Sequence, residues 1–170
     1  RAGLADRVAA AFAEAGVPLK KVTVEVTESV YLDQRDQIVA EQIQALRSAG
    51  MTVALDDFGT GFASLTHLLT VPVDVIKIDK SFVQRMVNDR AGTVIIKGLI
   101  DIARGLGICV VAEGVETAEQ AEALHWLGCT YGQGYLYSRA IDRSAISTLL
   151  KERRVIGRPL AADGAVSAAG

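Results

Sequence analysis

The sequence predicts an α/β chain with a parallel sheet. Short β-branched runs alternate with longer segments of helical periodicity along its 170 residues, and such alternation produces strand–helix–strand crossovers between parallel strands. Half of the residues are hydrophobic and 22% are charged, so the chain has enough apolar surface for a packed core. We expect about five parallel strands with helices on their outer face.

The N-terminal third contains two predicted helices separated by a strand. Leu4–Ala15 carries apolar residues at helical spacing and ends before Gly16. Val22–Thr27 is β-branched and alternating, which is typical of a strand. A second helix is predicted over Arg35–Ala49, with Gly50 just after its C-terminus. The apolar stripe of this helix consists of Ile38, Ile43 and Leu46.

The middle of the chain predicts two more strands and a long helical region. Thr52–Asp56 and Val73–Ile78 have the apolar character of buried strands. Between them, a Gly-rich turn leads into a short helix near Ala63–Leu69. The helical region covers Ser81–Leu106, and we expect it to break near Asn88.

The C-terminal third predicts two strands and two helices. Ile108–Ala112 is a fourth strand. The helix after it begins at Thr117, because Thr117 and Gln120 have the spacing of a capping box. Tyr131–Tyr135 predicts a short fifth strand, and Arg143–Arg154 a last helix.

Ionisable residues near the carboxyl ends of the strands indicate which parallel architecture is formed. Four strands each place one such residue on the face opposite their strongest apolar side chains. These residues are Glu25, Asp56, Lys77 and Glu113. A doubly wound sheet would bury these charges under helices, whereas a barrel gathers one face around an axis and opens at the carboxyl ends. We therefore expect a (β/α) barrel with its site at that rim.

The predicted strands are too few for a closed barrel, which uses about eight strands and roughly 200–250 residues. We expect an incomplete barrel whose first strands are absent from this sequence, because five strands alone would leave open edges. Residues 1–156 are interpreted as the C-terminal portion of the barrel. The Ala- and Gly-rich residues 157–170 are expected to form a flexible tail.

Composition excludes several classes of protein. The formal net charge is -2, and no basic run offers the Lys/Arg stripe that a polymeric nucleic acid requires, so we expect no such partner. No apolar stretch approaches a membrane span. With His67 and His125 as the histidines and no Cys-x-x-Cys, a zinc site of the usual kind is not expected. Cys109 and Cys129 are predicted to be buried thiols in a reducing compartment.

The acidic residues at the strand ends suggest metal chemistry. Converging carboxylates raise one another's pKa unless cations lie among them. Lys77 supplies one positive charge, and all-oxygen ligation favours Mg²⁺ or Mn²⁺ for the rest. Adjacent Asp56 and Asp57 suit two ions, which can clamp the attacking and leaving oxygens of a phosphoryl displacement.

Each of these residues also has a purely structural interpretation. Asp56 and Asp57 before a glycine are common in turns. Lys77 could extend its ammonium into solvent from a strand end, and Glu113 could solvate a turn. Glu28 could cap the next segment, and Gln133 could satisfy backbone groups.

Five short motifs occur in an order that resembles a known family. They are Glu25–Ser29 (EVTES), Asp56–Gly61 (DDFGTG), Lys77–Asp79 (KID), Ala112–Glu116 (AEGVE) and Gln133–Leu136 (QGYL). In this order they resemble the EAL family of bacterial cyclic di-GMP phosphodiesterases. The resemblance covers the later part of such a domain, from about Leu4 to Ile141. It implies a modified TIM barrel that uses two Mg²⁺ or Mn²⁺ ions to hydrolyse cyclic di-GMP to linear pGpG.

The resemblance also implies roles for individual residues. Glu25 and Asp56 resemble ligands of the first metal ion, and Asp56 with Asp57 those of the second. Glu113 resembles a further ligand and catalytic carboxylate, and Lys77 the lysine that helps to activate the attacking water. The remaining positions are implied to line the substrate site or to anchor the Phe58–Leu65 loop. They are Glu28, Phe58, Gly59, Asp79, Glu116 and Gln133.

Two functions remain open on the sequence. The first is hydrolysis of cyclic di-GMP, and the second is a non-catalytic receptor of the same fold that binds the dinucleotide or a protein partner. The segment in which the family carries its metal-binding Glu-Ala-Leu motif and the segment with its Asn ligand are not in this sequence; the tripeptide Glu122–Leu124 falls instead in the predicted helix after Thr117. The charged residues Glu25, Asp56, Asp57, Lys77 and Glu113 are all present. The family further implies a homodimer fused to sensory or GGDEF-type modules, in the cytoplasm or on the cytoplasmic side of a membrane anchor.

Overall fold

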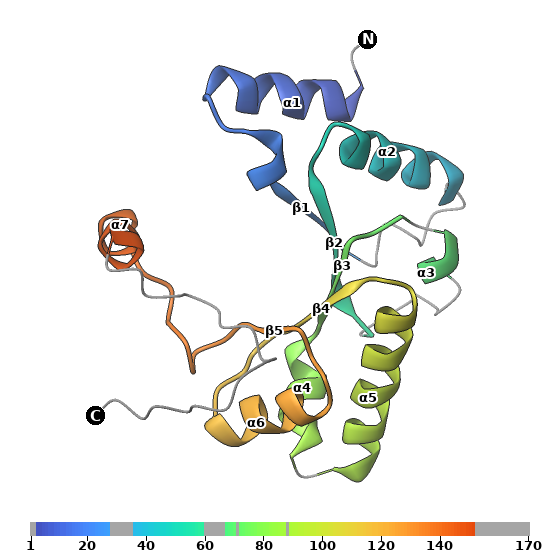
Figure 1. The fold of residues 1–170 in the computed structure, drawn as a ribbon, viewed down its shortest axis with the longest axis vertical. Coiled ribbons are helices and arrows are strands. Elements are labelled where there is room, and N and C mark those ends of the chain that lie inside the picture. Colours follow the sequence, from blue (N-terminus) through green and yellow to red (C-terminus); the bar gives the residue numbers. More distant parts are fainter. Residues whose placement is uncertain (1–2, 28–35, 60–66, 71, 88, 152–170) are drawn as a thin grey trace. The chain divides into compact units, whose positions relative to one another are not determined.

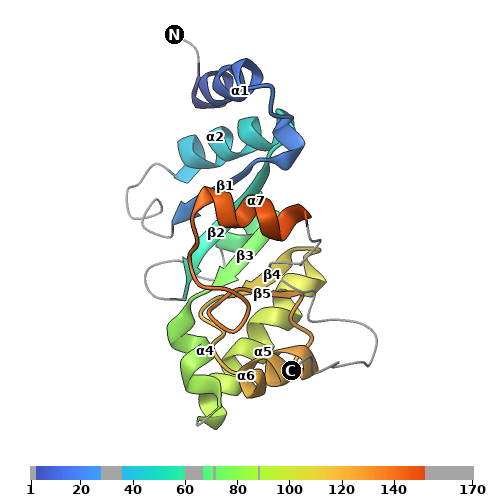
Figure 2. The same cartoon turned by 90° about the vertical axis from the view of Figure 1, so that its left-hand side faces the viewer.

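A computed structural model of the chain describes residues 3–27, 36–59, 67–70, 72–87 and 89–151. The chain divides into two compact units (Figure 1, Figure 2). The first unit consists of Arg1–Asp79 and Ile102–Val110, and the second of Lys80–Asp101 and Val111–Gly170.

The first unit is built on parallel strands. Strand β1 (Thr23–Thr27) pairs with β2 (Thr52–Phe58), and β2 with β3 (Val75–Ile78). The amide of Cys109, which begins β4 (Cys109–Ala112), donates to the carbonyl of Asp74 at 3.0 Å. The other elements of this unit are α1 (Leu4–Glu14), the 3-10 helix η1 (Leu19–Lys21), α2 (Asp36–Ser48) and α3 (His67–Thr70). Helix α1 packs on α2, and α2 packs on β2 (Figure 1).

The second unit continues the alternation. Helix α4 (Lys80–Met86) is followed by α5 (Arg90–Gly105), whose last turn belongs to the first unit. The end of β4 pairs in parallel with β5 (Tyr131–Gly132). The remaining helices are α6 (Ala118–Trp126) and α7 (Arg143–Lys151). Helices α4 and α6 lie side by side (Figure 2).

The strand order β1-β2-β3-β4-β5 confirms the predicted topology. Each strand lies next to its predecessor in sequence, and helices separate consecutive strands, as in an incomplete (β/α) barrel. The apolar strand residues form the core, with Val53, Leu55 and Ile78 at most 1% exposed. Helix α2 contributes Ile43 and Leu46, each 2% exposed, from its predicted stripe.

The ends of several elements follow their sequence signals. Gly50 has a φ of 95° just after α2, where its amide donates to the carbonyl of Arg47 and the amide of Met51 to that of Leu46. This is a Schellman ending, which favours glycine at the left-handed position. Thr117 caps α6 with Gln120 as a capping box, as predicted.

Other predictions need correction. Ile38 was expected on the buried stripe of α2 but is 57% exposed, because the helix packs through the Ile43–Leu46 face. Cys109 is exposed rather than buried, since it opens β4 before the strand becomes covered, whereas Cys129 is buried as predicted. Strand β5 ends at Gly132, because the following residues turn to bond the segment after β4.

Two strand boundaries also differ from the sequence patterns. Strand β2 extends two residues beyond Asp56, to Phe58, and β3 begins at Val75 rather than Val73. The long helical region does break, into α4 and α5, as expected. Residues 60–66, which include most of the predicted short helix, and the tail 157–170 lie outside the described residues. Among the helices that the structure describes, none combines the length and apolarity that a bilayer crossing requires.

Candidate functional site

The site in the first unit is organised around Lys77 on β3. Its side chain is 8% exposed, and its Nζ lies 2.8 Å from Oε1 of Glu25 on β1 and 2.8 Å from Oδ1 of Asp56 on β2. Three adjacent parallel strands thus each contribute one charged side chain to one cluster. The interpretation of Lys77 as a lysine whose ammonium reaches solvent is therefore wrong.

Partial burial of this cluster means that its charged groups need compensating charges nearby. The side chain of Asp56 is 18% exposed and that of Glu25 is 50% exposed. Oδ1 of Asp56 is shielded from solvent, and no donor among the described residues makes a well-aligned hydrogen bond to it. A buried carboxylate oxygen requires compensation, and the neighbouring Lys77 ammonium supplies part of it. Hard divalent cations prefer such carboxylate oxygens, so the donor set fits Mg²⁺ or Mn²⁺.

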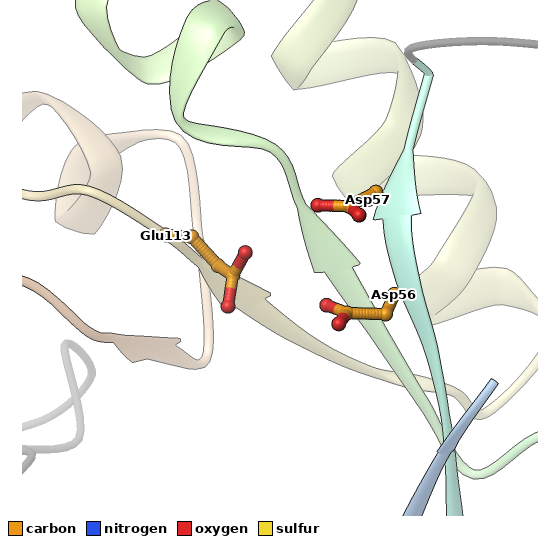
Figure 3. A group of neighbouring side chains, drawn as sticks. All are labelled: Asp56, Asp57 and Glu113. Carbon is orange, nitrogen blue, oxygen red and sulfur yellow. The ribbon is translucent and has the colours of Figure 1, made fainter. Parts of the chain in front are cut away.

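The backbone of β2 places two consecutive carboxylates on one side. In a regular strand, neighbouring side chains point to opposite faces. Here the pairing of β2 with β3 is irregular between Leu55 and Phe58, and Asp57 has a φ of 55°. Aspartate is among the few non-glycine residues that tolerate this left-handed conformation. As a result, Asp56 and Asp57 project in the same direction at the end of β2 (Figure 3).

Glu113 is the charged residue at the carboxyl end of β4, in the second unit. It directly follows β4 and is half-buried (Figure 3). Gly114 comes next with a φ of 65°, and an added Cβ there would lie 2.4 Å from Cβ of Lys80. The chain therefore turns sharply just after the carboxylate, at a position that excludes any side chain.

The loop-anchoring and lining residues of the first unit are partly described. Phe58 ends β2 and is 2% exposed, whereas Gly59 is exposed with a φ of 100°. Asp79 directly follows β3 and is half-buried, on the same strand face as Lys77 by alternation. Glu28 lies outside the described residues.

The two remaining predicted residues lie in the second unit. Glu116 is exposed, and its amide donates to Oε1 of Gln120 at 2.8 Å, so its described contact serves the start of α6. Gln133 is exposed, and its backbone bonds residues on either side of Glu113. The structure thus shows a backbone role for Gln133.

A cavity of about 660 Å³ opens beside β5 in the second unit. Its lining includes Gln133, Tyr135, Tyr137 and Arg139. The guanidinium of Arg139 lies 4.7 Å from the ring centre of Tyr135, which is a cation–π contact. Burial is the largest cause that raises the pKa of Tyr137. The sequence predicted a site role for Gln133 alone among these residues, although Tyr135 belongs to the same motif, because isolated aromatic and Arg side chains carry no periodic signal.

Comparison with known proteins identifies the family. A family model described as the EAL domain matches residues 1–140 of the chain. The chain belongs to the EAL domain family. The resemblance drawn from the five motifs is therefore confirmed, and with it an α/β fold of the TIM-barrel type.

Relatives and solved structures agree with this assignment. Cyclic di-GMP phosphodiesterase NbdA of Pseudomonas aeruginosa is 36% identical over 159 residues, which are 94% of this chain and 20% of NbdA. The EAL domain of Mycobacterium smegmatis DcpA has a TM-score of 0.84 at 39% identity and covers 89% of this chain and 67% of its own. Klebsiella pneumoniae BlrP1, solved as a manganese and cyclic di-GMP complex, has a TM-score of 0.73 at 36% identity, over 78% of this chain and 34% of its own.

The EAL chain is much shorter than its curated relatives. It spans about a fifth of their length, with 20%, 18% and 24% for the first three. Its likeness to them concerns the EAL region alone.

Proposed function

We propose that this EAL chain is the catalytic part of a phosphodiesterase that hydrolyses cyclic di-GMP to linear pGpG with Mg²⁺ or Mn²⁺. The observation that carries the proposal is the buried Lys77 bound to Glu25 and Asp56 at strand ends. Family membership supports the reaction class, since NbdA carries the name of a cyclic di-GMP phosphodiesterase. The manganese and cyclic di-GMP complex of BlrP1 supports the choice of ion and substrate.

The proposed metal ligands are carboxylates that lie on, or directly after, three of the strands. Glu25 and Asp56 would hold one ion, and Asp56 and Asp57 a second, with Asp56 between them. Glu113 would complete the set, because it directly follows β4, while the two aspartates lie near the carboxyl end of β2. The same-side projection of Asp56 and Asp57 supports this arrangement, since both carboxylates would be available to divalent ions on one side of the strand (Figure 3).

Lys77 is proposed as the residue that orients and activates water. Its ammonium is a fixed donor because two carboxylates hold it and its side chain is buried. Bound Mg²⁺ or Mn²⁺ supplies the positive charge that makes water nucleophilic and offsets the charge that develops on the phosphodiester. Attack of water on phosphorus forms one P–O bond and breaks another, which opens the ring to pGpG. Glu113 is proposed as a catalytic carboxylate in this hydrolysis step.

The remaining site residues predicted from the sequence are proposed to bind the substrate or to support its site. Asp79, Glu116 and Gln133 would line its site, and Gln133 already borders the cavity beside β5. Glu28 is proposed to anchor the loop that begins at Phe58 and Gly59. These roles come from their positions in the EAL motifs.

The domains attached to this chain, its oligomeric state and its location in the cell are also proposals. Its relatives are several times longer, and one is named an oxygen sensor protein, DosP of Escherichia coli. We propose that the native protein joins this EAL region to a sensory or GGDEF-type module, acts as a homodimer and works in the cytoplasm. Light scattering of the purified native protein measures the oligomeric state.

Turnover of cyclic di-GMP tests the proposed function. The full-length protein that carries this chain is incubated with cyclic di-GMP and Mg²⁺ or Mn²⁺, and pGpG is quantified by chromatography. We expect turnover that Asp56→Asn lowers by at least about 100-fold, because the substitution removes charge stabilisation from the transition state. The exposed carboxylate variant Glu122→Gln is the control and should keep normal turnover. Binding of cyclic di-GMP without hydrolysis would instead support the receptor alternative.

A further inference from the structure

Gly134 lies where two segments of the second unit meet through their backbones. A Cβ added to Gly134 would lie 2.2 Å from the carbonyl oxygen and 2.3 Å from the amide nitrogen of Val115. No real Cβ approaches backbone atoms so closely, and a backbone cannot rotate aside as a flexible side chain can. Position 134 therefore admits glycine alone in this conformation.

The close approach permits a ladder of three backbone hydrogen bonds. The amide of Gln133 donates to the carbonyl of Ala112 at 2.8 Å, and the amide of Val115 donates to the carbonyl of Gln133 at 3.0 Å. The amide of Leu136 then donates to the carbonyl of Val115 at 3.0 Å. Both polar backbone groups of the fully buried Val115 are thus satisfied by the segment after β5.

These bonds bracket Glu113. Ala112 precedes it and Val115 follows it two residues later, and both are bonded to residues 133–136. Between them, Gly114 is held against Lys80 with a φ of 65°. The backbone that carries the Glu113 carboxylate is consequently fixed on both sides by the segment after β5.

We propose that Gly134 is a positioning residue for Glu113. It acts by allowing the segment after β5 to form its backbone hydrogen bonds with the Ala112–Val115 turn. These bonds hold the Glu113 carboxylate in one orientation toward a divalent ion. This inference rests on the proposed function, in which Glu113 is a metal ligand. Groups that orient metal ligands commonly change metal affinity 10–100-fold when they are altered.

The variant Gly134→Ala tests the role directly. Its methyl group forces Val115 away, so Mn²⁺ affinity measured by calorimetry on the folded protein should fall at least about tenfold. Hydrogen exchange at the amides of Val115 and Leu136 should become faster, because their acceptors move. The control is Gly98→Ala on α5, where an added Cβ has no neighbour within 4 Å. This control should leave Mn²⁺ affinity unchanged.

Metal affinity separates positioning from a general structural role. The inference is overturned if Gly134→Ala lowers the melting temperature but the folded variant binds Mn²⁺ as tightly as wild type does. If Gly134→Ala does not fold, the wild-type protein provides a second measurement. Because coupling is reciprocal, Mn²⁺ should slow exchange at Val115 and Leu136 if their bonds position its ligand. The amide of Ile146, which donates to Asp142 at the start of α7, should not change.

The outcomes distinguish this inference from the function on which it rests. If wild-type protein binds no Mn²⁺, the proposed function fails and the inference fails with it. If wild type binds Mn²⁺ but exchange at Val115 and Leu136 does not respond, only the inference is overturned. If slowing occurs and disappears in Glu113→Gln, the link between the backbone ladder and the carboxylate is established.

Discussion

The ammonium nitrogen of Lys77 lies 2.8 Å from Oδ1 of Asp56, a carboxylate oxygen that is shielded from solvent. The Coulomb attraction between opposite charges at this distance is stronger in a buried setting than at a surface, and it offsets the cost of removing both groups from water. Glu25 approaches the same nitrogen from β1. The cluster is therefore a fixed pair of carboxylates around one cation, and loss of the cation would leave like charges facing each other.

Lys77→Met tests the importance of that cation. We expect turnover of cyclic di-GMP by the full-length protein to fall at least about 100-fold, because the donor that we propose to orient the attacking water is lost. Lys20→Met, at an exposed position of η1, is the matched control and should retain turnover. Near-normal hydrolysis by Lys77→Met would show that the proposed role of this lysine is wrong.

Asp57→Asn separates charge from backbone conformation. Asparagine also tolerates a φ near 55°, so the free energy of unfolding should stay within about 0.5 kcal/mol of wild type. Mn²⁺ affinity should fall at least about tenfold, because an anionic ligand is lost. Calorimetry and urea denaturation measure the two quantities. Unchanged Mn²⁺ binding would remove Asp57 from the proposed ligand set.

Asp74 is predicted to be a structural carboxylate at the start of β3. Its Oδ1 accepts from Nε and Nη2 of Arg47 at 3.0 and 2.6 Å, and its Oδ2 accepts from the amide of Val53 at 2.9 Å. Asp74→Ala should lower the free energy of unfolding by about 2 kcal/mol, because it leaves these donors without their acceptor.

An exposed ion pair provides the comparison for Asp74. Asp101 pairs with Lys97 on α5, and both side chains are 42% exposed. Asp101→Ala should cost no more than about 0.5 kcal/mol in urea denaturation, because solvent screens such pairs. Equal losses for the two variants would contradict a special role of Asp74.

Cys129 should make stability depend on alkaline pH. Burial raises the pKa of its thiol from an ordinary 9.0 to about 11. The unfolded chain therefore releases this proton first as pH rises, so the contribution to stability is complete below pH 9 and disappears between about pH 9 and 11. The loss approaches about 3 kcal/mol, since each unit of pKa is worth about 1.4 kcal/mol.

Two alanine variants isolate the effect of Cys129. Urea denaturation at pH 8 and pH 10.5 should show a smaller decrease for Cys129→Ala than for wild type. Cys109→Ala, at the exposed cysteine, should follow wild type. An identical decrease in all three proteins would assign the alkaline destabilisation to other groups.

The sequence predicted the elements well where local chemistry decides them. Glycine at Gly50 and the Thr117–Gln120 capping box ended and began helices as expected, because these signals act within one turn. Strand alternation likewise placed Glu25 and Asp56 toward a common partner, Lys77, since neighbouring parallel strands keep their register. The five motifs were enough to predict the EAL family.

Local patterns were insufficient where packing between distant segments decides the result. Ile38 has the spacing of a buried residue but is exposed, because helical periodicity does not say how wide a face is covered. Alternation would have sent Asp56 and Asp57 to opposite faces, and only the irregular pairing of β2 with β3 turns them the same way.

The order of strands and helices, the family and the residue types available for metal chemistry can all be read from the sequence. The tertiary structure decided that Lys77 is buried between two carboxylates and that Gly134 touches the backbone of Val115. The two groups of features differ in how far apart along the chain the deciding residues lie. Helix caps and alternation are set by neighbours in the chain, whereas burial, ion pairing and steric exclusion depend on residues that folding brings together.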